Sequence, residues 1–271
     1  MATIKDVKYY WNEHPLLSYE LNSLGTSDFF EKLDEIKRTE SDRFAIRYWS
    51  FNEFAGKKVL DVGCGPGWCA VNYAMGGAIT YAIDLTPNAV ELAKKHFAYR
   101  GVSGLIEEGN AESLIFENDF FDAVISSGVL HHTPDTEKAF KECFRVLKPG
   151  GIAKITLYRK GILHSDLLFW FTKLVMRYLR VKHPGADMAR NAKDVDNFIR
   201  QYDGELNPVG IGKTHKEWTK MLQHAGFSIQ GYEIHFFPKR FIPFNDNTLP
   251  GFIHYLLDRF LGTMIYFNLK K

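Results

Sequence analysis

Short apolar runs alternate with amphipathic segments between residues 57 and 158. The amphipathic segments carry helix signals, and one of them opens with Thr86 as N-cap and Pro87 in its first turn and ends at Gly101. The apolar runs are bounded by glycine or polar residues, as buried parallel strands are. They predict five strands, at about 57–63, 78–84, 105–110, 120–128 and 152–158. Alternation at this spacing predicts β-α-β units, and therefore an α/β fold with helices on both faces of a parallel sheet.

Further elements flank this alternating region on both sides. The segment 27–51 has the pattern of one long or broken helix. Alternating runs at 227–237 and 263–271 predict two late strands. We therefore divide the chain into an N-terminal helical cap (1–56), an α/β core (57–158), a helical insertion rich in aromatic and basic residues (159–213), and a C-terminal helix with two strands that complete the sheet (214–271).

The composition is that of a globular protein, with 45% hydrophobic and 24% charged residues. The N-terminus lacks the apolar segment of a signal peptide, and three cysteines without paired spacing predict no metal site, so we expect a reduced, cytoplasmic protein. Residues 159–271 carry 17 basic and 10 acidic side chains. This excess leaves open an anionic substrate, a nucleic acid or an acidic membrane surface, beside the simpler reading of a solvated surface.

The candidate chemistry begins in the turn after the first predicted strand, which reads VLDVGCGPGW. Gly63, Gly65 and Gly67 follow Asp61 there. A glycine-rich turn between a strand and a helix brings backbone N–H groups to a bound nucleotide. The spacing G-x-G-x-G differs from the G-x-G-x-x-G of dinucleotide sites. An acid at Asp61 would repel a pyrophosphate but suits the ammonium group of S-adenosylmethionine (SAM), which carries no phosphate.

Three more motifs follow in order along the core. Asp84 closes the second strand, where a carboxylate can accept both hydroxyls of a ribose, in dinucleotide and SAM sites alike. GNAES follows the third strand, SSGVLHHTPD follows the fourth, and RVLKPGG precedes the fifth. With these motifs, residues 57–158 resemble the class I (Rossmann-like) SAM-dependent methyltransferases, and most closely the group of ubiquinone/menaquinone-type and small-molecule methyltransferases.

The resemblance implies a seven-stranded, mostly parallel sheet, SAM as cofactor and S-adenosylhomocysteine as product. The cofactor-binding residues that it implies are Asp61, Gly63, Gly65, Gly67, Asp84, Leu85, Asn110, Ala111, Glu112, Ser127 and Trp11. Asn110 stands where many members have an aspartate, and its amide oxygen can still accept a hydrogen bond from adenine. Ser127 is expected to offer its backbone to the SAM ammonium group. Trp11 either covers the cofactor or anchors its helix.

Two adjacent histidines follow the fourth strand. In the family the second of them occurs with different substrates, which favours a structural or cofactor-side role for His132. His131 is the candidate substrate contact or general base, since it lies at the correct end of the sheet and imidazole titrates near neutral pH. A base is needed only where the acceptor must lose a proton.

The resemblance implies methyl transfer by in-line displacement to a small hydrophobic or aromatic or anionic acceptor. The alternatives are methylation of a tRNA or a protein, a SAM-binding module without catalysis and, least favoured, a dinucleotide oxidoreductase. No RNA-binding motif is visible, which disfavours nucleic acid. In the insertion, one helical side carries Leu167, Phe171, Leu174 and Tyr178. This stripe either packs on the core or belongs to a lid that meets a lipophilic acceptor or a membrane surface. The attacked atom and the oligomeric state stay open.

Overall fold

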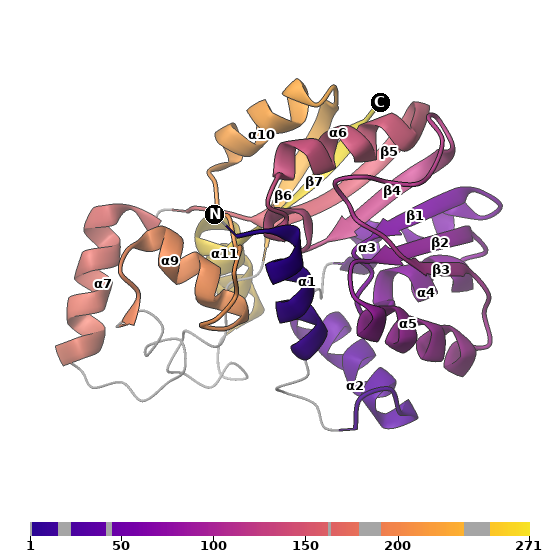
Figure 1. Cartoon of the computed structure of the whole chain (residues 1–271). Coiled ribbons are helices and arrows are strands. Elements are labelled where there is room, and N and C mark those ends of the chain that lie inside the picture. The colour runs from indigo at the N-terminus through magenta and orange to yellow at the C-terminus, as the bar shows by residue number, and fades with distance from the viewer. Residues whose placement is uncertain (1, 16–22, 42–44, 162–163, 179–190, 236–249) are drawn as a thin grey trace.

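The computed structural model describes the chain except for residues 1, 16–22, 42–44, 162–163, 179–190 and 236–249 (Figure 1). Its centre is a seven-stranded sheet in the order β3-β2-β1-β4-β5-β7-β6. The strands are β1 (Lys58–Val62), β2 (Ile79–Asp84), β3 (Leu105–Glu108), β4 (Phe121–Ser127), β5 (Leu147–Tyr158), β6 (Ser228–His235) and β7 (Met264–Lys270). Strands β1 to β5 are parallel, and β7 runs antiparallel to both β5 and β6. The predicted fold class is confirmed.

Helices cover both faces of the sheet (Figure 1). They are α1 (Ile4–Glu13), α2 (Ser27–Ile36), α3 (Ala45–Trp49), α4 (Trp68–Met75), α5 (Pro87–Arg100), α6 (Thr136–Val146), α7 (Asp166–Tyr178), α9 (Val195–Arg200), α10 (His215–His224) and α11 (Gly251–Leu261), with the short turns η1 (Lys37–Ser41), η2 (Phe51–Phe54), η3 (Leu130–His132) and η5 (Gln201–Asp203). The N-terminal pattern at 27–51 therefore forms a broken helix. Helix α5 has the predicted ends, because the Thr86 hydroxyl accepts from the Ala89 N–H and Gly101 adopts a φ of 66°.

The alternation of apolar residues along the strands builds one core on each face of the sheet. Leu60 and Val62 pack with residues of α6 and α10, and Val59 packs with residues of α2 and α4. Burying both faces removes nearly all apolar strand surface from water, which is the main stabilising contribution in such a sheet. The carboxyl ends of β1 to β4 then meet at one edge of this packed body, where the loops after these strands gather.

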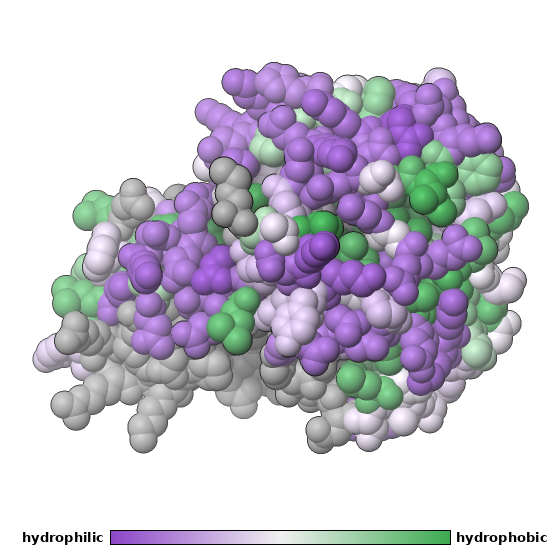
Figure 2. Space-filling view, viewed as in Figure 1, coloured by the Kyte–Doolittle hydropathy of each residue, from purple (hydrophilic) through white to green (hydrophobic). Residues whose placement is uncertain are grey.

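The insertion presents its apolar stripe to solvent. Helix α7 packs inward through Phe169, which is 3% exposed, whereas Leu167, Phe171, Leu174 and Tyr178 are between 61% and 85% exposed. The stripe therefore does not pack on the core. Figure 2 shows apolar side chains gathered over α7 at the left edge of the molecule. Within the described part of the chain, no helix is both long and apolar enough to cross a bilayer.

Candidate functional site

The glycine turn joins β1 to α4 along a path that only glycine follows easily. Gly63, Gly65 and Gly67 have φ values of 75°, 52° and 80°, in the left-handed region that disfavours residues with a Cβ. A Cβ on Gly63 would lie 2.3 Å from Cγ1 of Val129, in the loop after β4. The turn therefore packs directly against that loop, and these two loops form adjacent walls of one pocket.

Asp61 brings a buried carboxylate to this pocket. The side chain is on β1, and the residue is 1% exposed. Its Oδ2 accepts from the backbone N–H of Ala70 at 3.1 Å, and its Oδ1 has no hydrogen-bond partner among the described residues. Burial raises the pKa of Asp61 to about 7. A buried carboxylate oxygen without a partner is costly unless a ligand supplies a donor.

Asp84 closes the neighbouring strand β2 and holds the turn in place. Its Oδ2 accepts from the N–H of Gly65 at 2.9 Å, and its Oδ1 accepts from the N–H and the hydroxyl of Thr86, both at 3.0 Å. Burial raises the pKa of Asp84 as well. Each carboxylate oxygen has two lone pairs, so these three bonds leave Oδ2 able to accept from one ligand hydroxyl.

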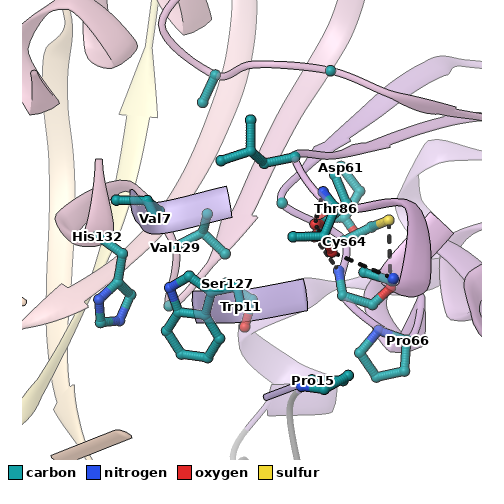
Figure 3. Close-up of a pocket in the computed structure, with 18 of the residues that line it drawn as sticks. Val7, Trp11, Pro15, Asp61, Cys64, Pro66, Thr86, Ser127, Val129 and His132 are labelled. Atoms are coloured by element: carbon teal, nitrogen blue, oxygen red, sulfur yellow. Dashed lines mark hydrogen bonds between the residues drawn. The ribbon is translucent and has the colours of Figure 1, made fainter. Parts of the chain in front are cut away.

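The remaining walls come from the loops after β3 and β4 and from α1. Figure 3 shows Trp11 and His132 on one side of the pocket, and Asp61, Cys64 and Thr86 on the other, with Ser127 between them. The loop after β3 contributes residues 109–111, and α1 covers the pocket with Ile4, Val7 and Trp11. The site therefore lies at the carboxyl ends of the parallel strands, where open α/β sheets bind their ligands.

These residues fit the parts of SAM better than those of a dinucleotide. The unpartnered Oδ1 of Asp61 suits the ammonium group, and Asp84 suits the ribose hydroxyls. Lys37 also lines the pocket, and its positive charge suits the carboxylate group of the ligand. The same charge lowers the pKa of Asp61, although burial raises that pKa by more. The buried acid Asp61 beside the glycine turn would repel a pyrophosphate.

Comparisons with known proteins agree with this chemistry. Residues 60–155 match the family model described as "Methyltransferase domain". The ubiquinone biosynthesis O-methyltransferase of Xanthomonas oryzae pv. oryzae is 40% identical over 168 residues, which cover 61% of this chain and 70% of that protein. The protein of the same name from Pseudomonas fluorescens (strain SBW25) is 41% identical over 147 residues, which cover 54% of this chain and 60% of that protein.

This chain belongs to the class I SAM-dependent methyltransferases. A solved SAM-dependent methyltransferase from Methanosarcina mazei has a TM-score of 0.56 at 20% identity, covering 84% of this chain and 96% of that chain, which shows the shared fold. The chain spans about half to two thirds of the curated relatives it matches, from 46% to 70% of their lengths.

In this member of the methyltransferase family, nine of the eleven predicted cofactor-binding residues line the pocket; the exceptions are Gly67 and Glu112. Gly67 shapes the turn at the start of α4. Glu112 points its Oε1 at the backbone N–H of Asp135, which donates at 2.8 Å. Asn110 lines the pocket, and its Oδ1 accepts from the N–H of Glu112 at 2.9 Å.

His131, the predicted substrate contact or general base, lies outside the pocket lining. Its ring is 0% exposed, and both ring nitrogens lack a hydrogen-bond partner among the described residues. The ring packs between His132 and Tyr158, with centroid distances of 4.3 and 4.0 Å. Burial lowers the pKa of His131 well below its usual range, so the ring is neutral. Successive side chains of the short turn η3 point in different directions, and His132 is the one that faces the pocket.

Two charged residues of this pocket were not predicted from the sequence. Lys37 lies in η1, a turn of π-helix that follows α2 and breaks its periodicity. Asp203 lies in the insertion, far along the chain from the family motifs. The dipeptide that Asp203 forms with Gly204 is a turn signal, but a turn signal does not say what the turn contacts.

Proposed function

We propose that this protein transfers a methyl group from SAM to a small acceptor. The observation that carries the proposal is the buried Oδ1 of Asp61, which lacks a partner among the described residues and lines a pocket closed by the glycine turn. When bound, SAM supplies a methyl group activated by its sulfonium: the acceptor's lone pair forms the new bond to carbon as the carbon–sulfur bond breaks, and that electron pair stays on sulfur.

The protein's own residues hold and align the reactants in this proposal. Asp61 receives the ammonium group, Lys37 the carboxylate and Asp84 the ribose hydroxyls, while Asn110 and Ala111 lie beside the adenine. Because the methyl group arrives activated, the protein acts mainly by orienting the acceptor and excluding water. Helix α1, which covers the pocket, serves the exclusion of water.

We infer a small, largely apolar acceptor, of aromatic type. The part of the pocket that we assign to the acceptor is lined by Ile4, Val7, Trp11 and Val129, and His132 offers a polar contact there. The curated relatives named above are ubiquinone biosynthesis O-methyltransferases, which supports an aromatic acceptor. The three acids in the same pocket, Asp61, Asp84 and Asp203, favour a neutral acceptor over an anionic one, because like charges repel.

A second part of the proposal concerns a lipid surface. The apolar stripe of α7 has a counterpart on α11, where Phe252, Tyr255, Leu256 and Phe260 follow a helical spacing and are between 45% and 67% exposed. Aromatic residues on exposed amphipathic helices are typical of contact with the membrane interface. Such a contact would suit a lipophilic acceptor.

Two experiments test these proposals. Isothermal titration calorimetry should detect binding of S-adenosylhomocysteine and no binding of NAD. Mass spectrometry should detect a methylated product when the protein is incubated with SAM and a panel of phenols. Binding without product for any small molecule, tRNA or protein would favour a SAM-binding module, and NAD binding would refute the proposal.

For the lipid surface, Phe171→Glu should reduce sedimentation with vesicles of phosphatidylglycerol and phosphatidylcholine. Met75→Glu, at an exposed apolar residue of α4, is the matched control and should sediment as the unaltered protein does. Equal sedimentation of both variants and the unaltered protein would refute the lipid contact.

A further inference from the structure

The end of the insertion returns to the pocket as a firmly held loop. Asn207 is 0% exposed, and its Nδ2 donates to the carbonyl of Arg200 at 3.1 Å. The guanidinium of Arg200 donates in turn to the carbonyl of Asn207. Further along, the N–H of Ile211 donates to the carbonyl of His131 at 3.0 Å. These bonds hold the backbone of this loop against η3.

Asp203 is the residue that this loop places in the pocket. The hydroxyl of Tyr158, at the end of β5, donates to Oδ2 of Asp203, and the hydroxyl of Tyr10, on α1, donates to its backbone carbonyl. A Cβ on Gly204 would lie 2.3 Å from the Tyr10 hydroxyl oxygen, so the next residue must be glycine for this contact to form. Burial, and then the charge of Asp203, raise the pKa of Tyr10 to about 12. Helix α1 and strand β5 thus both contact Asp203, one through its backbone carbonyl and the other through its carboxylate.

His132 faces the same carboxylate with one defined nitrogen. Its Nδ1 lies 2.6 Å from the carbonyl oxygen of Val209, and because a carbonyl only accepts, Nδ1 carries the hydrogen. Its Nε2 lies 3.3 Å from Oδ2 of Asp203. In the neutral ring Nε2 is therefore the nitrogen that can take up a proton, and it does so next to a negative charge. Both residues line the pocket beside Trp11, whose ring centroid is 5.1 Å from that of His132.

We propose that Asp203 is a positioning residue that prepares His132 to take a proton from a hydroxyl or amine group of the methyl acceptor. The inference rests on the methyl transfer proposed above and names the acceptor's reacting group. The acceptor's O–H or N–H proton passes to Nε2 of His132, and its bonding electron pair stays on the oxygen or nitrogen that attacks the methyl carbon. The negative charge of Asp203, 3.3 Å from Nε2, stabilises the imidazolium formed, whereas the carbonyl of Val209 accepts from Nδ1 and so orients the ring, as the carboxylate does in a catalytic triad.

The first test compares two phenols that differ in acidity. At pH 7.5, Asp203→Asn should lower kcat with catechol about 100-fold, the usual size of a general-base contribution. It should change kcat by less than about threefold with 4-nitrocatechol, which is largely ionised without help. Asp196→Asn, at an exposed residue of the same insertion that pairs with Lys160 at 2.6 Å, is the matched control. Equal losses with both phenols would show a merely structural role and overturn the inference.

The second test needs no turnover. Sinefungin carries an amino group in place of the transferred methyl group, whereas S-adenosylhomocysteine carries nothing there. By titration calorimetry, Asp203→Asn should weaken sinefungin about tenfold relative to S-adenosylhomocysteine, because a negative charge beside the added ammonium is lost. An unchanged ratio of the two affinities would overturn the inference even if neither phenol is a substrate. Failure of the unaltered protein to bind S-adenosylhomocysteine would instead refute the proposed function itself.

Discussion

Asp61→Asn should weaken the binding of S-adenosylhomocysteine and abolish most of its dependence on pH. This ligand has the same amino-acid tail as SAM, so its ammonium group tests the proposed role of Asp61 directly. Burial holds the pKa of Asp61 at about 7 in the ligand-free protein. The carboxyl is therefore increasingly protonated as the pH falls below 7, and a protonated carboxyl does not attract an ammonium group.

The size of the effect follows from that pKa. Ionising Asp61 costs about 1.4 kcal/mol for each pH unit below its pKa, so the affinity of the unaltered protein should fall roughly tenfold from pH 7.5 to pH 6. In Asp61→Asn the charge-assisted bond, worth about 1.5–3 kcal/mol, is lost, and affinity at pH 7.5 should drop about 10- to 100-fold.

Titration calorimetry between pH 5.5 and 8.5 measures both effects. The variant should be at least as stable as the unaltered protein at pH 7.5. The pKa of Asp61 is raised in the folded state above its usual value of 3.8, so the contribution of this group to stability decreases as the pH rises from about 4 to 7, and Asp61→Asn removes that decrease. Thermal denaturation checks this point. Affinity that stays constant from pH 7.5 to pH 6 in the unaltered protein would refute the reasoning.

Three further predictions concern stability. Gly63→Ala should lower the free energy of unfolding in urea by about 2–4 kcal/mol, since its Cβ would lie 2.3 Å from Val129 Cγ1. Gly65→Ala, with no atom within 4 Å of its Cβ, should cost only about 1–2 kcal/mol, and equal costs would contradict this packing. Burial lowers the pKa of His96 to about 4, so the contribution of this group to stability falls as the pH drops from 6.5 to 4, opposite in sign to that of Asp61. The stability of His96→Gln relative to the unaltered protein, measured by urea unfolding, should therefore rise across that range, and a constant difference would count against it. Thr86→Ala removes the N-cap of α5 and should lower the free energy of unfolding in urea by about 1 kcal/mol, whereas an unchanged value would argue against the cap.

Much of the fold could be predicted from local signals in the sequence. The alternation of apolar runs and amphipathic segments gave the five parallel strands, and the spacing of Thr86 and Gly101 marked the ends of α5. These predictions succeed because capping and left-handed φ depend on a few neighbouring residues. The order of the strands, with β7 between β5 and β6, depends instead on contacts between segments far apart in the chain.

The site divides in the same way. Asp61, the glycine turn and Asp84 were predictable, because each lies at the carboxyl end of a parallel strand and these ends meet at one edge of a sheet. The sequence did not predict which of His131 and His132 faces the pocket, because their orientation depends on a turn held against a distant loop. The carbonyl of Val209 orients His132, and no pattern near His132 announces that contact.

The sequence by itself thus determined an α/β sheet with a glycine turn and two acids at the ends of its strands, since hydrophobic period and backbone conformation are local properties. The tertiary structure alone decided that Lys37 and Asp203 join them. Lys37 lies in η1, where the periodicity of α2 breaks, and Asp203 lies in a turn of the insertion; only the packing of these two segments in the folded chain brings their charges into the pocket.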